Sequence, residues 1–179
     1  IRARIARFKI ASDAQDHGSS LREVESAQKE FNNDTCINLR SDCEYFIASA
    51  YARLGQDNIA ETMLSDVIEK NRGTGDRQCA NAMNDLARIR IRQQRWKEAQ
   101  SLYQSAYQWF HENGDSYGAG STRANIGILL QTTDPPQAEQ CFRNAAGLLH
   151  QLGSARTELI HLTNLARTRY LQSRYTESR

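Results

Sequence analysis

The chain has 179 residues, of which 39% are hydrophobic and 25% are charged, an ordinary composition for a soluble globular domain. The net charge of +2 gives no bulk electrostatic argument for nucleic-acid binding, and no apolar run approaches the roughly 18–20 residues of a membrane helix. The 10 glycines and 2 prolines are too few for a turn-dense all-β fold.

The first third of the chain is expected to form two amphipathic helices. Residues 1–16 place Ile1, Ile5 and Phe8 on one side and several basic residues elsewhere. Basic amphipathic starts also occur in membrane-surface and nucleic-acid contacts, but the solvated face of a packed helix is the favoured interpretation. Gly18-Ser19-Ser20 is expected to be a turn with an N-cap, and the second helix runs from there to Phe31.

The middle of the chain predicts two helix pairs. Helices are expected over 36–54 and, capped by Asp57 or Asn58, to about Lys70. A second pair is expected over 79–93 and 96–112, with a tight turn near Gln94-Arg95. In this pair Ala87 and Ala99 mark the close approach, and Trp96 is expected to fill the wide end.

The last third predicts helices over 121–131, 136–151 and 155–172. Gly118-Ala119-Gly120 before the first of them could cradle a phosphate, but no strand precedes it and no third glycine follows. The segment is therefore interpreted as a connector that allows close packing. Asp134 is expected to cap the helix at 136, with proline in the first turn.

These helix pairs repeat with a period of 39 residues. Equivalent alanines lie at positions 60, 99 and 138, and equivalent glycines lie at positions 75, 114 and 153. A third set of small residues recurs in the first helix of each pair. The predicted structural positions of the repeat are Ala48, Ala60, Ala87, Ala99, Gly127, Ala138, Ala166, Gly75, Gly114 and Gly153.

The pattern resembles the tetratricopeptide repeat, with Ala50-Tyr51-Ala52-Arg53-Leu54-Gly55-Gln56 and then Ala60, Leu64 and Val67 as its best local match. The resemblance implies an all-α fold, a right-handed superhelical α-solenoid of antiparallel helix pairs. The period exceeds the family's usual value of about 34 and the repeats end in Gly rather than Pro. This variant, with Gly-Asp between repeats, is similar to the Pins and kinesin light chain scaffolds and to the sensor domains of bacterial MalT-type regulators.

We expect one repeat domain over 1–179. It comprises a degenerate repeat at 1–35, repeats at about 36–75, 76–114 and 115–153, and a partial repeat at 154–179. The chain has no initiator Met and its last helix begins and stops, so we expect it to be a fragment of a longer protein.

The resemblance also implies a groove lined by the first helix of each pair. Two asparagines, Asn125 and Asn164, occupy the register position that commonly grips the backbone of an extended peptide, whereas Phe46 and Asp85 depart from it. Arginines would give the groove a basic floor suited to carboxylates. The predicted partner-binding residues are Arg53, Arg88, Arg92, Asn125, Asn164 and Arg167. The alternative is that these arginines are merely solvated and paired with carboxylates of neighbouring helices.

The expected function is a non-catalytic, cytoplasmic module that binds a protein or peptide, acidic in the sharper hypothesis, without direct contact to membrane or nucleic acid. Homodimerisation through the terminal repeats is a further expectation. The alternative is the regulatory sensor domain of a bacterial transcription activator or signalling protein, binding a small effector or its own output domain. No catalytic constellation, metal site or cofactor is expected, and the four cysteines are interpreted as buried thiols.

Overall fold

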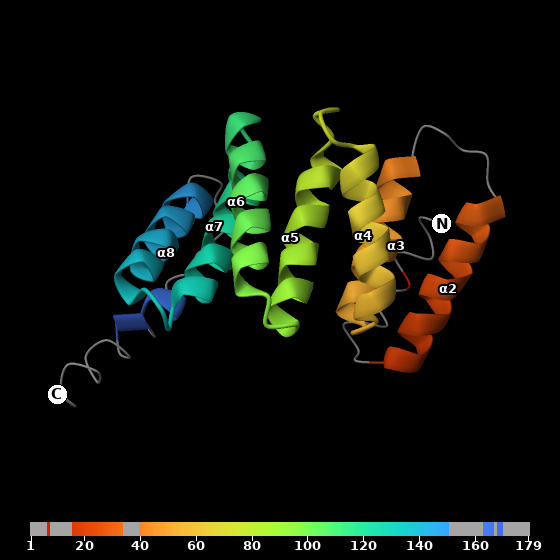
Figure 1. Ribbon diagram of the computed structural model, residues 1–179, viewed down its shortest axis with the longest axis horizontal. Helices are drawn as coiled ribbons and strands as arrows, with labels where there is room; N and C mark the ends of the chain where they lie inside the picture. Colours follow the sequence, from red (N-terminus) through yellow and green to blue (C-terminus); the bar gives the residue numbers. More distant parts are fainter. Residues whose placement is uncertain (1–6, 8–15, 34–39, 151–162, 167, 170–179) are drawn as a thin grey trace. The chain divides into compact units, whose positions relative to one another are not determined.

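The computed structural model describes residues 7, 16–33, 40–150, 163–166 and 168–169, and the elements within these ranges are α-helices (Figure 1). The all-α fold of repeated helix pairs is thereby confirmed. The expected helix over 1–16 and most of the one over 155–172 lie outside the described residues. The helices are α2 (His17–Asn33), α3 (Arg40–Arg53), α4 (Asp57–Lys70), α5 (Arg77–Arg92), α6 (Trp96–Glu112), α7 (Ser116–Leu130) and α8 (Pro135–His150).

The chain divides into two compact units, Ile1–Gln93 and Gln94–Arg179. In the first unit α3 packs on α4 and α5, α4 packs on α5, and α2 packs on α3. Its core is built from small and aliphatic side chains that solvent does not reach. The residues with at most 2% exposure in this unit include Ile47, Ala48, Ala60, Leu64, Val67, Ala80, Ala82, Ala87 and Ile89.

In the second unit α7 packs against both α6 and α8. Tyr103, Phe110 and Phe142 fill its core and are at most 1% exposed. Leu165, from the helical residues 163–166, packs against a cluster that includes Ala124 and Phe142. A hydrogen bond of 2.9 Å from Gln131 Nε2 to Thr168 Oγ1 joins the end of α7 to the same segment.

Gly-Asp pairs separate the helices where the repeat predicted them. Gly75 and Gly114 have φ of +71° and +69°, in the left-handed region where a side chain is strained. The following aspartates each accept a hydrogen bond from a backbone N–H of the next helix. Asp76 accepts from Gln78 at 2.9 Å and Asp115 accepts from Gly118 at 2.8 Å. Each pair thus ends one repeat and begins the next.

The predicted start of α7 is wrong, because the helix begins at Ser116 and not at residue 121. Gly118 and Gly120 lie inside the helix and are buried, so they do not form a connector. A Cβ added to Gly118 would lie 2.3 Å from Phe110 Cδ1, and one on Gly120 would lie 3.0 Å from Leu149 Cγ. The glycines therefore allow α7 to approach α6 and α8, which is the close packing that their small size predicted.

Three other local predictions are corrected. Gly18-Ser19-Ser20 forms the first turn of α2, and Asp16 rather than a serine accepts the Ser19 N–H at 3.0 Å. Gln56 precedes α4 without a side-chain cap, so neither Asp57 nor Asn58 is the N-cap. Trp96 is the first residue of α6 and is 52% exposed, so it does not fill the end of a helix pair.

The tight turn predicted at Gln94 is confirmed, since this residue has φ of 61° between α5 and α6. The Asp134 cap of α8 is confirmed as well, because its Oδ1 accepts the Gln137 N–H at 3.1 Å. Among the described cysteines, Cys43, Cys79 and Cys141 are buried. Burial raises the pKa of the Cys79 and Cys141 thiols, which keeps them protonated.

We predict that Gly118→Ala destabilises the second unit by about 1–3 kcal/mol, because the new methyl group overlaps the buried Phe110 ring. Gly147→Ala in α8 is the matched control, since a Cβ there meets nothing within 4 Å. That variant should raise stability by about 0.5–1 kcal/mol through the better helix propensity of alanine. Urea denaturation measures both changes, and equal midpoints for the two variants would contradict the packing argument.

Candidate interaction surface

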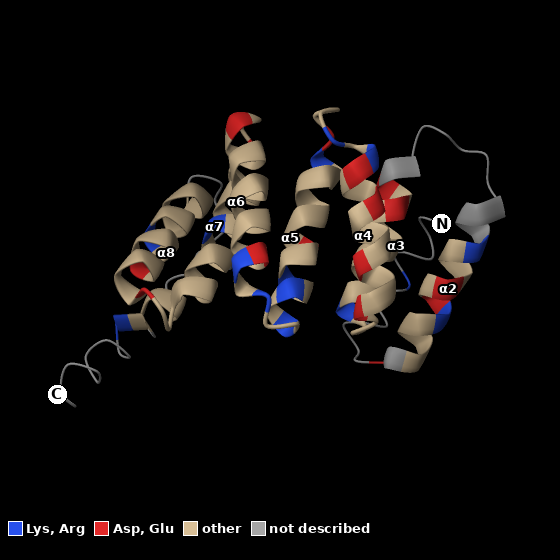
Figure 2. Cartoon of the chain, viewed as in Figure 1, with Lys and Arg blue, Asp and Glu red and all other residues tan. Residues whose placement is uncertain are grey.

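The two units present very different charge patterns on their helices. Figure 2 shows basic and acidic segments on α2, α3, α4 and α5 of the first unit, whereas α7 of the second unit is almost entirely uncharged. Arg123 is the only charged residue of α7, while α5 carries Arg88, Arg90 and Arg92 near its C-terminal end. The predicted binding residues of the first unit therefore lie in a charged environment.

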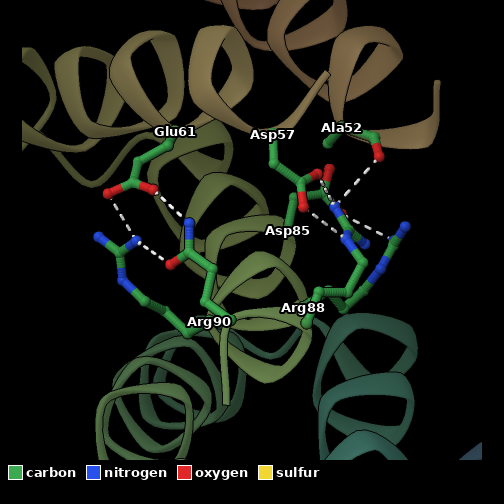
Figure 3. A network of polar contacts seen from close by, with 8 residues as sticks. Ala52, Asp57, Glu61, Asp85, Arg88 and Arg90 are labelled. Atoms are coloured by element: carbon green, nitrogen blue, oxygen red, sulfur yellow. Dashed lines mark hydrogen bonds and ion pairs between the residues drawn. The ribbon is translucent and has the colours of Figure 1, made fainter. Parts of the chain in front are cut away.

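A buried carboxylate organises the charged residues where α5 faces α3. Asp85 is 7% exposed, and its Oδ2 accepts a hydrogen bond of 3.1 Å from the Tyr45 hydroxyl of α3. Its Oδ1 accepts a hydrogen bond of 2.9 Å from Nη1 of Arg88, one turn further along α5. Asp85 therefore ties the two helices together and holds the Arg88 guanidinium in one position (Figure 3).

The Tyr45 phenol is held in its neutral form by this arrangement. Burial, and then the neighbouring Asp85 carboxylate, raise the pKa of Tyr45 above its ordinary value of 10.0. The neutral hydroxyl can donate to Asp85, whereas a phenolate would face a second negative charge. The contact thus depends on Tyr45 remaining protonated.

Arg92 binds Asp57 of α4 and the Ala52 carbonyl oxygen of α3. Its Nε donates to Asp57 Oδ2 at 2.9 Å, and its Nη2 contacts both Asp57 Oδ1 and the Ala52 carbonyl oxygen. This forked geometry uses the arrangement that guanidinium and carboxylate groups favour. Arg92 therefore joins the C-terminal end of α5 to the N-terminal end of α4 and to the end of α3.

A second set of polar contacts between α4 and α5 involves Arg90, which is 8% exposed. Its Nη1 lies 2.6 Å from Glu61 Oε1 and 2.9 Å from Gln93 Oε1, and Gln93 Nε2 donates to Glu61 Oε2 at 2.8 Å. The closed triangle satisfies a charge that would be costly to bury alone. Arg90 thus has a structural role and is not available to a partner.

The predicted binding residues differ in what the structure leaves available. Arg53, the last residue of α3, is exposed, and Arg88 keeps 44% of its side chain exposed with one donor used by Asp85. Arg92 is paired with the Asp57 carboxylate of a neighbouring helix, as the alternative interpretation of the arginines expected. Arg167 lies outside the described residues.

In the second unit, Asn125 and Asn164 are partly buried on α7 and on the helical segment 163–166. Among the described residues, neither side-chain amide has a hydrogen-bond partner. Both amides keep a donor and an acceptor for a ligand. This is the property that an asparagine needs to grip a peptide backbone.

The structural positions of the repeat are buried with one exception. Ala48, Ala60, Ala87, Ala99 and Ala138 have no exposed surface, and Gly127 is also buried. Ala166 is exposed, unlike its equivalents in the other helices, and Gly153 lies outside the described residues. The remaining two glycines, at positions 75 and 114, have the positive φ described above.

Sequence reasoning missed Tyr45 and treated Asp85 only as a departure from an asparagine position. The available signal was spacing, since Tyr45 and Asp85 are 40 residues apart and Asp57 and Arg92 are 35 apart, both close to one repeat. No helix of the described ranges is both long and apolar enough to span a bilayer. Those ranges also contain no group of three or more His, Cys, Asp or Glu side chains placed to hold a metal ion.

Comparison with known proteins identifies the repeat. Residues 78–149 match the model of the family described as tetratricopeptide repeat. No curated protein matched the chain. Solved structures of low sequence identity share the fold over most of its length.

The crystal structure of BtubC (BKLC) from P. vanneervenii is 15% identical, with a TM-score of 0.61 over 93% of this chain and 78% of that chain. The crystal structure of the nearly identical TPR-like repeats of a putative kinesin light chain from Podosopora anserina is 14% identical. Its TM-score is 0.73 over 98% of this chain and 88% of that chain. At this identity the likeness supports the fold alone.

We predict that the free energy of unfolding falls as the pH rises above about 10. Because the pKa of Tyr45 is raised in the folded state, the unfolded chain releases this proton at a lower pH than the folded one. The contribution is fully present below the ordinary pKa and is lost as the pH rises toward the folded value. Tyr45→Phe should flatten the decline by up to about 1.4 kcal/mol per pH unit. Urea unfolding between pH 8 and 11 measures the slope, and an unchanged slope in the variant would contradict the assignment.

Proposed function

We propose that the tetratricopeptide repeats of residues 78–149 make this chain a non-catalytic module that binds an extended segment of a protein partner. Such repeats generally mediate protein–protein interactions, and the neighbouring folds are TPR-like scaffolds. The observation that carries the proposal is that the side-chain amides of Asn125 and Asn164, on equivalent helices of the repeat, have no hydrogen-bond partner among the described residues. A peptide main chain offers the donors and acceptors that these amides need.

The finer proposal concerns the first unit taken by itself: Arg88 binds a carboxylate of a protein partner. Arg88 is the best candidate among the predicted arginines, because Asp85 uses one of its donors and its side chain remains 44% exposed. Arg92 is a weaker candidate, since its Nε and Nη2 already serve Asp57 and Ala52. A guanidinium held by a buried carboxylate is oriented before the ligand arrives, which lowers the entropic cost of binding.

The experiment that tests this proposal is selection from a displayed library of random ten-residue peptides. We predict that the unmodified protein enriches peptides containing Asp or Glu. Arg88→Gln should lose this enrichment and bind the selected peptides at least about tenfold more weakly, as expected for a charge-assisted hydrogen bond. Fluorescence anisotropy with synthetic selected peptides gives the dissociation constants.

Arg95→Gln is the matched control for this experiment. Arg95 is 43% exposed and pairs with Glu98 three residues later, as Arg88 is 44% exposed and pairs with Asp85 three residues earlier. The control should bind as the unmodified protein does. If Arg88→Gln and the control bind the selected acidic peptides equally well, the carboxylate contact is wrong. A protein that selects no peptide would favour the sensor-domain alternative.

A further inference from the structure

The exposed face of α7 carries a stripe of four residues with no charge. Tyr117, Ser121, Asn125 and Ile128 are spaced by four, four and three residues, which places them on one side of the helix. Tyr117 and Ile128 are each 51% exposed, and Ser121 and Asn125 are partly exposed between them. We call this set the α7 stripe.

The α7 stripe contains large apolar side chains that are not buried in the core. Four large hydrophobic side chains are exposed in the described part of the chain, and two of them, Tyr117 and Ile128, belong to the stripe. The other two, Ile59 and Trp96, lie on α4 and at the start of α6. Exposed aromatic and aliphatic side chains grouped with polar neighbours are typical of interaction sites, whereas single ones are common everywhere.

The only charge of α7 is directed away from the stripe. Arg123 lies with its guanidinium carbon 5.1 Å from the centre of the Tyr107 ring, a residue of α6. Its Nε is buried and has no hydrogen-bond partner among the described residues. The guanidinium is therefore packed against the α6 side of the helix by a cation–π contact, and the stripe itself offers no counter-charge to a ligand.

We propose that the α7 stripe binds an uncharged segment of a partner, with one aliphatic or aromatic side chain packed against Ile128 and a second one packed against Tyr117, about three turns away on the helix. The Asn125 amide, which has no partner among the described residues, meets the main chain of that segment. The inference rests on the proposed function, since it names the chemistry of a partner segment that the second unit would bind.

The absence of charge on the α7 stripe is the reason for proposing an uncharged segment as its ligand. A charged side chain that covered the stripe would lose its hydration without finding an opposite charge, which is unfavourable. Apolar side chains gain by leaving water, one with Ile128 and another with Tyr117, and Ser121 and Asn125 between them satisfy main-chain polar groups. The first unit differs, because Arg88 offers a positive charge there.

The test uses the displayed library of random ten-residue peptides, followed by synthetic selected peptides. We predict that the unmodified protein enriches Leu, Ile, Val, Phe or Tyr in addition to acidic residues. Ile128→Ser and Tyr117→Ser should each lose the apolar enrichment, and should bind the selected peptides at least about fivefold more weakly, as expected for an interface anchor. The acidic preference assigned to Arg88 should remain in both variants.

Ile59→Ser is the matched control, because Ile59 is 43% exposed on α4 and lies outside the stripe. It should select and bind peptides as the unmodified protein does. Because all three side chains are exposed, urea midpoints should stay within the range of ordinary surface substitutions, which separates lost binding from lost folding.

The outcomes distinguish this inference from the proposed function. Apolar enrichment that persists in both stripe variants overturns the inference and leaves the function standing. A protein that selects no peptide overturns both. Sedimentation velocity covers the remaining occupant: a concentration-dependent dimer that Ile128→Ser abolishes would assign the stripe to a second copy of the chain and overturn the peptide proposal.

Discussion

Close approach between helices at small residues is the constraint on which the structure depends. Five alanines at equivalent positions of the repeat have no exposed surface, and at Gly127 an added Cβ would lie 2.8 Å from the Phe142 ring. Interiors are packed too densely for such overlap to be absorbed without cost. In α7 the small residues Gly118, Gly120 and Gly127 lie against side chains of α6 and α8, whereas Tyr117 and Ile128 are exposed. The packing period therefore also sets which side chains a partner can meet.

The same small residues explain which parts of the fold the sequence could predict. A period of 39 residues, shared by alanines and glycines, indicates helix pairs because one helix pair and its turns must fit within each period. Gly75 and Gly114 mark boundaries correctly, since each stands before a capping aspartate. Gly118 and Gly120 misled the prediction of α7 because a glycine needed for a turn and a glycine needed for packing look alike locally. The contacts that distinguish the two cases, Gly118 with Phe110 and Gly120 with Leu149, are tertiary contacts that the local sequence does not show.

The candidate site was predictable in its residue types but less so in its pairings. The repeat register places Arg88, Arg92 and Asn125 on comparable faces, and the structure finds Arg88 exposed and Asn125 partly exposed there. The register does not say which carboxylate each arginine meets: Arg88 pairs with Asp85 on its own helix, whereas Arg92 pairs with Asp57 of α4, 35 residues away. Asp57 was expected to cap a helix, but it is the first residue of α4 and binds Arg92, and Asp85, seen only as a departure from an asparagine position, holds Arg88. Ion pairs of this kind depend on distances of a few ångströms that a helical register alone does not fix.

The internal pairing of Arg88 has a consequence for how a partner would be recognised. A ligand carboxylate that reaches Arg88 finds a charge already partly neutralised by Asp85, so the added attraction is smaller than that of an unpaired guanidinium. Such a contact contributes more to discrimination than to affinity, because a negatively charged Asp85 also repels a misplaced anion. The uncharged α7 stripe has the opposite character, since burial of Ile128 and Tyr117 is non-directional and weakly selective. The charged face of the first unit would therefore contribute mainly specificity, and the uncharged stripe of the second unit would contribute mainly affinity.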